Sequence, residues 1–169
     1  VGTTGTVSLS GGVTIGATLT AAGGNITLNG NTAVTADVDI NANITSPGTI
    51  TVTAPRDILV GAKLETTGGA GMNIMLTADS DSNDTGGVQI KAAGQLISDD
   101  GVTLAGSDLS VTGAAVDGVV IDSDGASLQV DAGGNILIQS VVSAPPTITS
   151  QTIINGAVRT TGAASTISI

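Results

Sequence analysis

Two short stretches of the chain decide its fold: residues 48–54 read Gly-Thr-Ile-Thr-Val-Thr-Ala, and residues 73–78 read Asn-Ile-Met-Leu-Thr-Ala. Each alternates aliphatic and polar residues after a turn-forming Gly or Asn. This period of two is typical of a β-strand with one buried face. Helix is disfavoured, because Gly and β-branched Thr are spread through the whole chain. The two stretches therefore predict short strands.

The same apolar–polar–apolar triplet recurs from one end of the chain to the other. Its first residues are Val7, Ile26, Ile50, Ile74, Val102, Leu128, Ile148 and Ile167. Their mean spacing is about 23 residues, which falls within the range of solenoid repeats. Two more short strands are expected in each interval. The second of the three strands is read in Val13-Thr14-Ile15 and its equivalents, and more loosely in Leu109-Ser110-Val111 and Ile136-Leu137-Ile138.

Three short strands in each repeat of about 20 residues, separated by Gly, Asn, Asp and Pro turns, predict a parallel β-helix. We expect one solenoid over residues 1–169, with about seven coils of about 19–28 residues whose inward Ile, Val and Leu stack into ladders. Asn25, Asn73 and Asn135 stand directly before a strand, as stacked corner asparagines would. An all-β sandwich is the competing fold, although it normally brings aromatic core residues and hairpins.

Composition excludes several classes of function. The chain has no His, Cys, Phe, Tyr or Trp, and its net charge is −10. Without His and Cys there is no Ser–His–Asp or Cys–His nucleophile, no ordinary zinc site and no disulfide. Without aromatic rings and with a negative field, nucleic acid is not an expected partner. The aliphatic runs are too short for membrane insertion.

One acidic segment, residues 79–87, interrupts the fourth coil; we call it the acidic loop. Its sequence is Asp-Ser-Asp-Ser-Asn-Asp-Thr-Gly-Gly, and its candidate calcium ligands are Asp79, Asp81, Asn83 and Asp84. Hard oxygen ligands at alternating positions suit calcium. Compared with an EF-hand loop, however, Asp84 stands where Gly is needed and Ile90 replaces the bidentate Glu. The alternative is a solvated loop without a metal, and no other cofactor is expected.

Two further patterns have both a functional and a structural interpretation. The carboxylates of Asp99-Asp100-Gly101 and Asp122-Ser123-Asp124-Gly125 could serve glycoside hydrolysis in a polysaccharide-degrading enzyme, but Asp-Gly also makes turns. The basic residues are scattered, which disfavours the enzyme: Arg56, Lys63, Lys91 and Arg159. The outward residues of the first strands resemble an ice-binding threonine row, although exposed β-strands favour Thr anyway: Ser8, Thr27, Thr51, Met75, Thr103, Gln129, Thr149 and Ser168.

The strand phrases resemble the shaft repeats of filamentous haemagglutinin-like adhesins, exoproteins of bacterial two-partner secretion. Those that carry the resemblance are Gly24-Asn25-Ile26-Thr27-Leu28, the two stretches quoted first, and the segment 128–138, Leu-Gln-Val-Asp-Ala-Gly-Gly-Asn-Ile-Leu-Ile. Similar phrases occur in autotransporter passengers and other β-strand-repeat exoproteins. The resemblance implies a right-handed β-helix, secretion to the bacterial cell surface, and a role in adhesion or as a surface fibre. It transfers no catalytic or binding residue.

The expected partners follow from this resemblance and from the ends of the repeat. Ile167-Ser168-Ile169 falls inside an expected first strand, and uncapped coils expose hydrogen-bonding edges. We therefore expect end-to-end stacking, either on flanking β-helical coils of a longer rod or on other copies in a self-stacking filament or sheath. A host or neighbouring cell surface is a further expected partner. The leading hypothesis is a non-catalytic, secreted structural shaft.

Overall fold

The computed structural model describes residues 2–3, 7–30, 37–81, 86–106, 119–121, 128–140 and 152–169. Every regular element in these ranges is a strand, and the strands form three parallel sheets that we call A, B and C. No helix in these ranges is long and apolar enough to cross a membrane. The prediction of an all-β fold of short parallel strands is confirmed.

Each sheet is made of every third strand, counted in chain order. Sheet A contains β1 (Gly2–Thr3), β4 (Leu19–Ala21), β7 (Ile44–Ser46), β10 (Lys63–Thr66), β13 (Gln95–Ser98), β16 (Leu128–Ala132) and β19 (Ala157–Thr160). Sheet B contains β2 (Val7–Gly11), β5 (Ile26–Gly30), β8 (Ile50–Thr53), β11 (Ile74–Thr77), β14 (Val102–Gly106), β17 (Ile136–Ser140) and β20 (Ile167–Ser168). Sheet C contains β3 (Val13–Ile15), β6 (Val38–Ile40), β9 (Ile58–Val60), β12 (Val88–Ile90), β15 (Val119–Ile121) and β18 (Thr152–Ile154).

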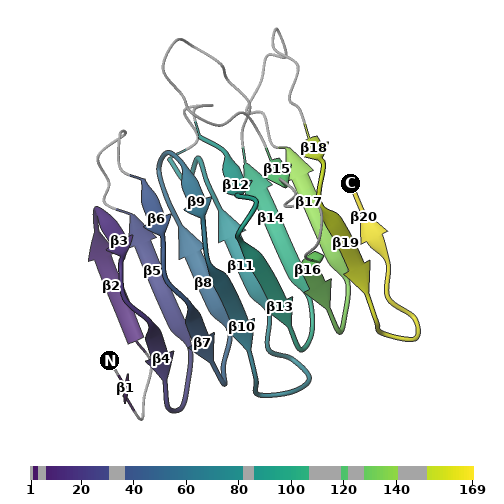
Figure 1. Cartoon of the computed structure of the whole chain (residues 1–169), viewed down its shortest axis with the longest axis horizontal. Helices are drawn as coiled ribbons and strands as arrows, with labels where there is room; N and C mark the ends of the chain where they lie inside the picture. Colours follow the sequence, from purple (N-terminus) through teal and green to yellow (C-terminus); the bar gives the residue numbers. More distant parts are fainter. Residues whose placement is uncertain are drawn as a thin grey trace, which may run out of the picture.

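The pairing is that of a solenoid. The chain passes from sheet B to sheet C to sheet A, and each strand then pairs in parallel with the strand three positions later. We call one such passage a coil. Figure 1 shows the result: the strands lie side by side along the long axis, and the two chain ends lie at opposite ends of the molecule. The structure is therefore β-solenoid-like.

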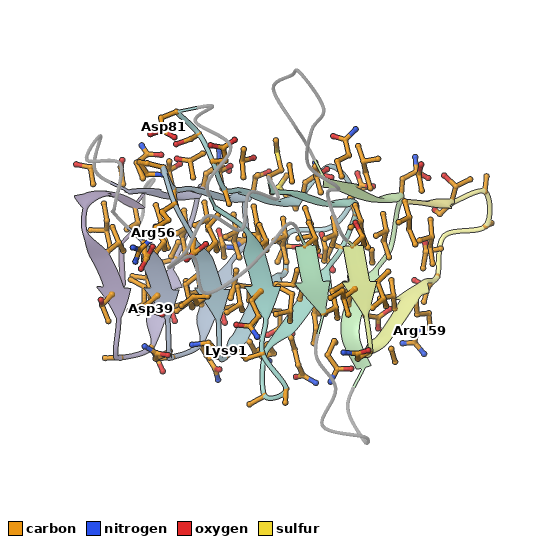
Figure 2. All side chains as sticks on the ribbon, turned by 90° about the horizontal axis from the view of Figure 1, so that it is seen from above. Asp39, Arg56, Asp81, Lys91 and Arg159 are labelled. Carbon is orange, nitrogen blue, oxygen red and sulfur yellow. The ribbon has the colours of Figure 1, made fainter. Side chains whose placement is uncertain are left out.

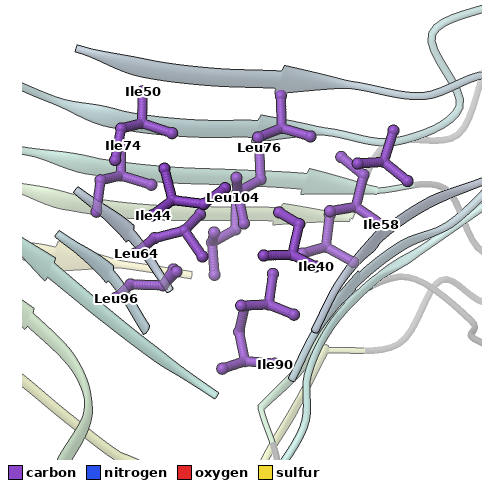
Figure 3. Close-up of a cluster of buried hydrophobic side chains, with 14 of the residues drawn as sticks. Ile40, Ile44, Ile50, Ile58, Leu64, Ile74, Leu76, Ile90, Leu96 and Leu104 are labelled. Atoms are coloured by element: carbon purple, nitrogen blue, oxygen red, sulfur yellow. The ribbon is translucent and has the colours of Figure 1, made fainter. Parts of the chain in front are cut away.

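Aliphatic side chains from all three sheets fill the interior (Figure 3). The strands alternate buried and outward positions, so the inward residues of successive coils stack directly on one another. Ile50 and Ile74 are paired in sheet B, and both are fully buried. Ile58 of sheet C and Leu64 of sheet A, also fully buried, belong to the same coil as Ile50. Burying such side chains is the main source of stability in the fold.

The sequence-based assignment of strands to sheets is wrong in the C-terminal part. Leu128 begins a strand of sheet A, whereas Ile136 begins the equivalent strand of sheet B. The last sheet B strands start at Val102, Ile136 and Ile167, so the coils between them are longer than any that the triplets predict. The expected range of coil lengths is therefore too narrow. Ile148 and the segment 109–111 lie outside the described residues.

The variation in coil length is concentrated at the corner between sheets B and C. Only Gly12 separates β2 from β3, whereas the segment 107–118 separates β14 from β15. The connections between sheets C and A vary less, from the pair Gly61-Ala62 to the segment 122–127. A triplet pattern alone cannot locate such insertions, because inward and outward positions alternate identically in all three sheets. This is the physical reason for the wrong assignment.

Candidate functional site

The corner between sheets A and B contains a row of buried hydroxyl groups. Ser46, Thr66 and Ser98 are the last residues of three successive sheet A strands, and each is at most 5% exposed. We call them the buried hydroxyl row. Each lies two positions after a buried aliphatic residue, so the alternation of the strand turns the hydroxyl inward. The sequence analysis did not predict this row, although each of its residues stands at an inward position of the strand alternation.

Each hydroxyl in this row satisfies backbone groups of the turn. The Ser46 Oγ donates to the carbonyl oxygen of Gly24 at 3.0 Å and accepts the Gly48 amide at 3.1 Å. The Thr66 Oγ1 accepts the Asp99 amide at 2.9 Å and donates to the Met72 carbonyl oxygen at 3.2 Å. Buried backbone groups need such partners, so the row ties neighbouring coils together.

Asparagines at the same corner bond to the next coil, as the sequence predicts. The Oδ1 atoms of Asn25, Asn73 and Asn135 each accept a backbone amide at 2.9 Å, from Thr49, Gly101 and Thr166 respectively. The stack does not place asparagine on asparagine, because Thr49 stands between Asn25 and Asn73. The predicted binding of corner amides is confirmed, but the predicted ladder of stacked asparagines is wrong, because asparagine alternates with other residues along the stack.

A polar cluster lies at the corner between sheets B and C. The Arg56 Nε donates to the Asp37 Oδ1 at 2.6 Å, and its guanidinium also bonds the second oxygen of that carboxylate. This bidentate hydrogen bond with Asp37 raises the pKa of Arg56. Asp57 is only 1% exposed; its Oδ1 accepts the Gly87 amide at 3.0 Å, and its Oδ2 lies 3.7 Å from Arg56. The cluster therefore fixes three successive coils at this corner.

The other three basic side chains are also paired with carboxylates. Lys63 lies 2.7 Å from Glu65, Lys91 lies 3.9 Å from Asp39, and the Arg159 Nε donates to Asp131 at 3.1 Å. Asp131 raises the pKa of Arg159 through this hydrogen bond. Figure 2 shows Lys91 and Arg159 toward the edge of the molecule opposite Asp81. Each of the four cations is thus already paired with a carboxylate, which disfavours a basic site for an anionic substrate.

The acidic loop is described only in part. Asp79 has a left-handed φ of 52°, which Asp tolerates better than most residues. Ser80 continues the corner by donating its amide to the Ala54 carbonyl oxygen at 3.0 Å, and Asp81 is exposed. Asn83 and Asp84 lie outside the described residues. In the described part of the chain no three metal-ligating side chains converge. The calcium site therefore stays a prediction.

The paired carboxylates at residues 99 and 100 hold a turn. The Asp99 Oδ2 accepts the Gly69 amide at 2.6 Å, and the Asp100 Oδ2 accepts the Gly71 amide at 2.8 Å. Both carboxylates are thus engaged with the corner of the preceding coil, which agrees with the turn interpretation. Asp122 and Asp124 lie outside the described residues.

The outward row of sheet B differs from the predicted row after Thr103, because Leu137 pairs directly with Ser168 and leaves no place for a further residue between them. Register places Leu137, not Gln129, beside Thr103. Gln129 is fully buried in sheet A at a bulge, where its Oε1 accepts the Ala157 amide at 3.0 Å. Thr149 lies outside the described residues. Met75 and Leu137 interrupt the threonine row, so its surface lacks the regular hydroxyl lattice that ice binding would use.

Comparisons with protein-family models, with curated proteins and with solved structures give no match for this chain.

Proposed function

We propose that this chain is a segment of the structural shaft of a secreted bacterial adhesin or cell-surface fibre, without a catalytic role. In this proposal it forms a right-handed parallel β-helix of about seven coils. The observation that carries the proposal is the unbroken parallel pairing of each strand with the strand three positions later, in all three sheets. A molecule paired in this way lengthens by adding coils and needs no change in its cross-section.

The contacts between coils suit a rod. Neighbouring coils bond through strand pairs, and several of them also through the corner asparagines and the buried hydroxyl row. Since coils repeat at about 4.8 Å, the six intervals between the seven sheet B strands span about 29 Å. The proposed partners along the axis are flanking β-helical coils.

The chemistry of the side chains favours a structural over an enzymatic role. A polysaccharide-degrading site needs carboxylates facing the substrate and side chains that hold the sugar. Here the carboxylates of Asp99 and Asp100 accept backbone amides, and all four cations are in ion pairs. The chain also has no aromatic residue on which a sugar ring could stack.

The test uses the cells that produce the protein, with an epitope inserted after Ile169. Residues 26–73 form two coils, and they end at Asn73, on the same corner as Asn25. Five extra tandem copies of this segment should add about 48 Å of reach, at about 4.8 Å per coil. Immunogold microscopy or atomic force microscopy of intact cells would measure that distance. The expected result is an accessible epitope that moves outward by this length.

An epitope confined to the cell interior, or one whose distance from the surface does not change, would contradict the shaft role. A screen of the purified chain for polysaccharide cleavage is the companion measurement. Reproducible cleavage that is lost in an Asp99→Asn, Asp100→Asn variant would favour the enzyme instead.

A further inference from the structure

The outer face of sheet B carries no charge. Its seven described strands contain no Asp, Glu, Lys or Arg, although the chain has a net charge of −10. Sheet A, by contrast, carries Lys63, Glu65, Asp131 and Arg159, and sheet C carries Asp39. In the part of the chain that the structure describes, the charge therefore lies on the other two sheets and on the corners.

This face is regular and two rows wide. We call it the sheet B face. Its first row is Ser8, Thr27, Thr51, Met75, Thr103, Leu137 and Ser168, and its second row is Ser10, Asn29, Thr53, Thr77, Ala105 and Gln139. Every strand pair keeps its register, whereas sheet A has a bulge at Leu128/Val130. Most side chains in the rows are short, as close packing between two sheets requires.

Met75 lies at the centre of the sheet B face. Its strand, β11, is the fourth of the seven strands, and Met75 is 41% exposed. The other large apolar residues of the described chain that are similarly exposed lie on or beside the terminal strands: Leu9, Ile153, Ile167 and Ile169. A terminal strand lacks a neighbour on one side, but Met75 has paired strands on both sides. Its exposure therefore reflects an outward position on a complete sheet.

We propose that the sheet B face packs against the same face of a second copy of this chain, side by side, with the Met75 side chains of the two copies in contact. Two molecules with a charge of −10 repel each other wherever acidic surfaces meet, and the uncharged face is where they can approach closely. A two-fold symmetric pair brings the central strand opposite its own equivalent. The pairing does not depend on the proposed shaft role.

The size of the face sets the strength of the pair. Strands that average about four residues at about 3.3 Å, stacked over six intervals of about 4.8 Å, give roughly 400 Å² per copy. The total of about 800 Å² is below the roughly 1,200 Å² that stable complexes usually bury. The pair is therefore weak at this length, and each further coil would add contact area to it.

Two other interpretations fit the structure less well: pairing of two copies through sheet C, and binding of an uncharged polysaccharide to the sheet B face. Sheet C has a single outward row, and Asp39 with Lys91 places charges on or beside it. An uncharged polysaccharide would also accept a neutral face with hydroxyl groups. The chain, however, has no aromatic residue to stack on sugar rings. A second copy is the occupant that needs no such residue.

Single cysteines test the pairing cleanly, because the chain has no cysteine of its own. Met75→Cys on sheet B is compared with Thr45→Cys on sheet A and Leu59→Cys on sheet C, which are both outward and half-buried. Disulfide-linked dimers are quantified by non-reducing electrophoresis during mild oxidation. Each rate is divided by the rate at which that thiol reacts with a small disulfide reagent, which corrects for exposure. We expect at least a tenfold faster normalised rate for Met75→Cys.

A charge on the face should abolish this advantage. Adding Thr51→Asp and Thr103→Asp to Met75→Cys should lower its normalised rate to that of the controls, while adding Thr45→Asp should not. Circular dichroism of each variant verifies that it is folded. Equal normalised rates for the three single cysteines, or a rate insensitive to the added aspartates, would overturn the pairing. Depletion of the wild-type chain by cellulose or chitin, abolished by Thr51→Asp, together with equal rates, would assign the face to a polysaccharide instead.

Discussion

Replacing Thr66 with Val tests whether the buried hydroxyl row holds the coils together. The two side chains have nearly the same shape, so the change removes the hydroxyl without leaving a cavity. It leaves the Asp99 amide without the acceptor that lies 2.9 Å away. The Met72 carbonyl oxygen keeps a donor, because the Ser98 Oγ also lies 3.0 Å from it. This hydrogen bond is part-buried, and an amide that loses its partner in such a position costs about 1–3 kcal/mol.

This cost should be visible in equilibrium unfolding. With a urea slope of about 2 kcal/mol per molar, a loss of about 2 kcal/mol lowers the midpoint by about 1 M. Because the chain has no aromatic residue, intrinsic fluorescence is not an available signal, and far-UV circular dichroism has to follow the transition. Amide hydrogen exchange at Asp99 gives a local readout, and we expect its protection to fall in the variant.

The matched control is Thr27→Val, the same chemical change on the outward face of sheet B. An outward substitution on a strand should change the free energy of unfolding by less than about 0.5 kcal/mol. The reasoning is refuted if the Thr66 and Thr27 variants unfold at the same urea concentration and Asp99 keeps its protection. In that case the buried hydroxyl would contribute nothing beyond its shape.

Four further outcomes follow from the corners. Gly48→Ala should destabilise the chain by about 1–3 kcal/mol in urea unfolding, because an added Cβ meets the neighbouring coil's backbone, whereas Gly16→Ala, with open space, should be neutral. Asp57→Ala should cost about 1–3 kcal/mol by the same assay, because it removes the acceptor of a buried amide. The pKa of Arg56 is raised by its hydrogen bond with Asp37, so this pair contributes fully to the stability of the fold below the ordinary pKa of arginine and is lost only above it. A series of melting temperatures should therefore show no change from Arg56 titration between about pH 6 and 10. Calorimetric titration should give calcium heat if the acidic loop binds the ion, and the absence of heat would refute that hypothesis.

Much of the fold could be predicted from the sequence, because it depends on patterns of neighbouring residues. The triplets at Val13, Val38, Ile58 and Val88 lie in sheet C as predicted. The corner asparagines bond the next coil as predicted. These features depend only on alternation over a short stretch of chain and on the turn preference of Asn and Gly.

The candidate sites were less predictable, because they join residues from different coils. Arg56 and Asp37 belong to different coils, and no periodic signal selects that aspartate among the others. Gln129 was predicted to point outward, but a bulge in its strand turns it into the interior. A bulge shifts every later residue by one position, and alternation in the sequence does not record it.

The sequence by itself determined that the chain forms short strands with one aliphatic face, separated by tight turns, and that it lacks the side chains of most catalytic sites. Only the tertiary structure decided which strands share a sheet, which hydroxyls are buried, which carboxylate each cation meets, and that one face is free of charge. The physical reason is the range of the interactions. Strand alternation is fixed by the backbone geometry of adjacent residues. Sheet membership depends instead on connections that vary, between sheets B and C, from Gly12 alone to the whole segment 107–118.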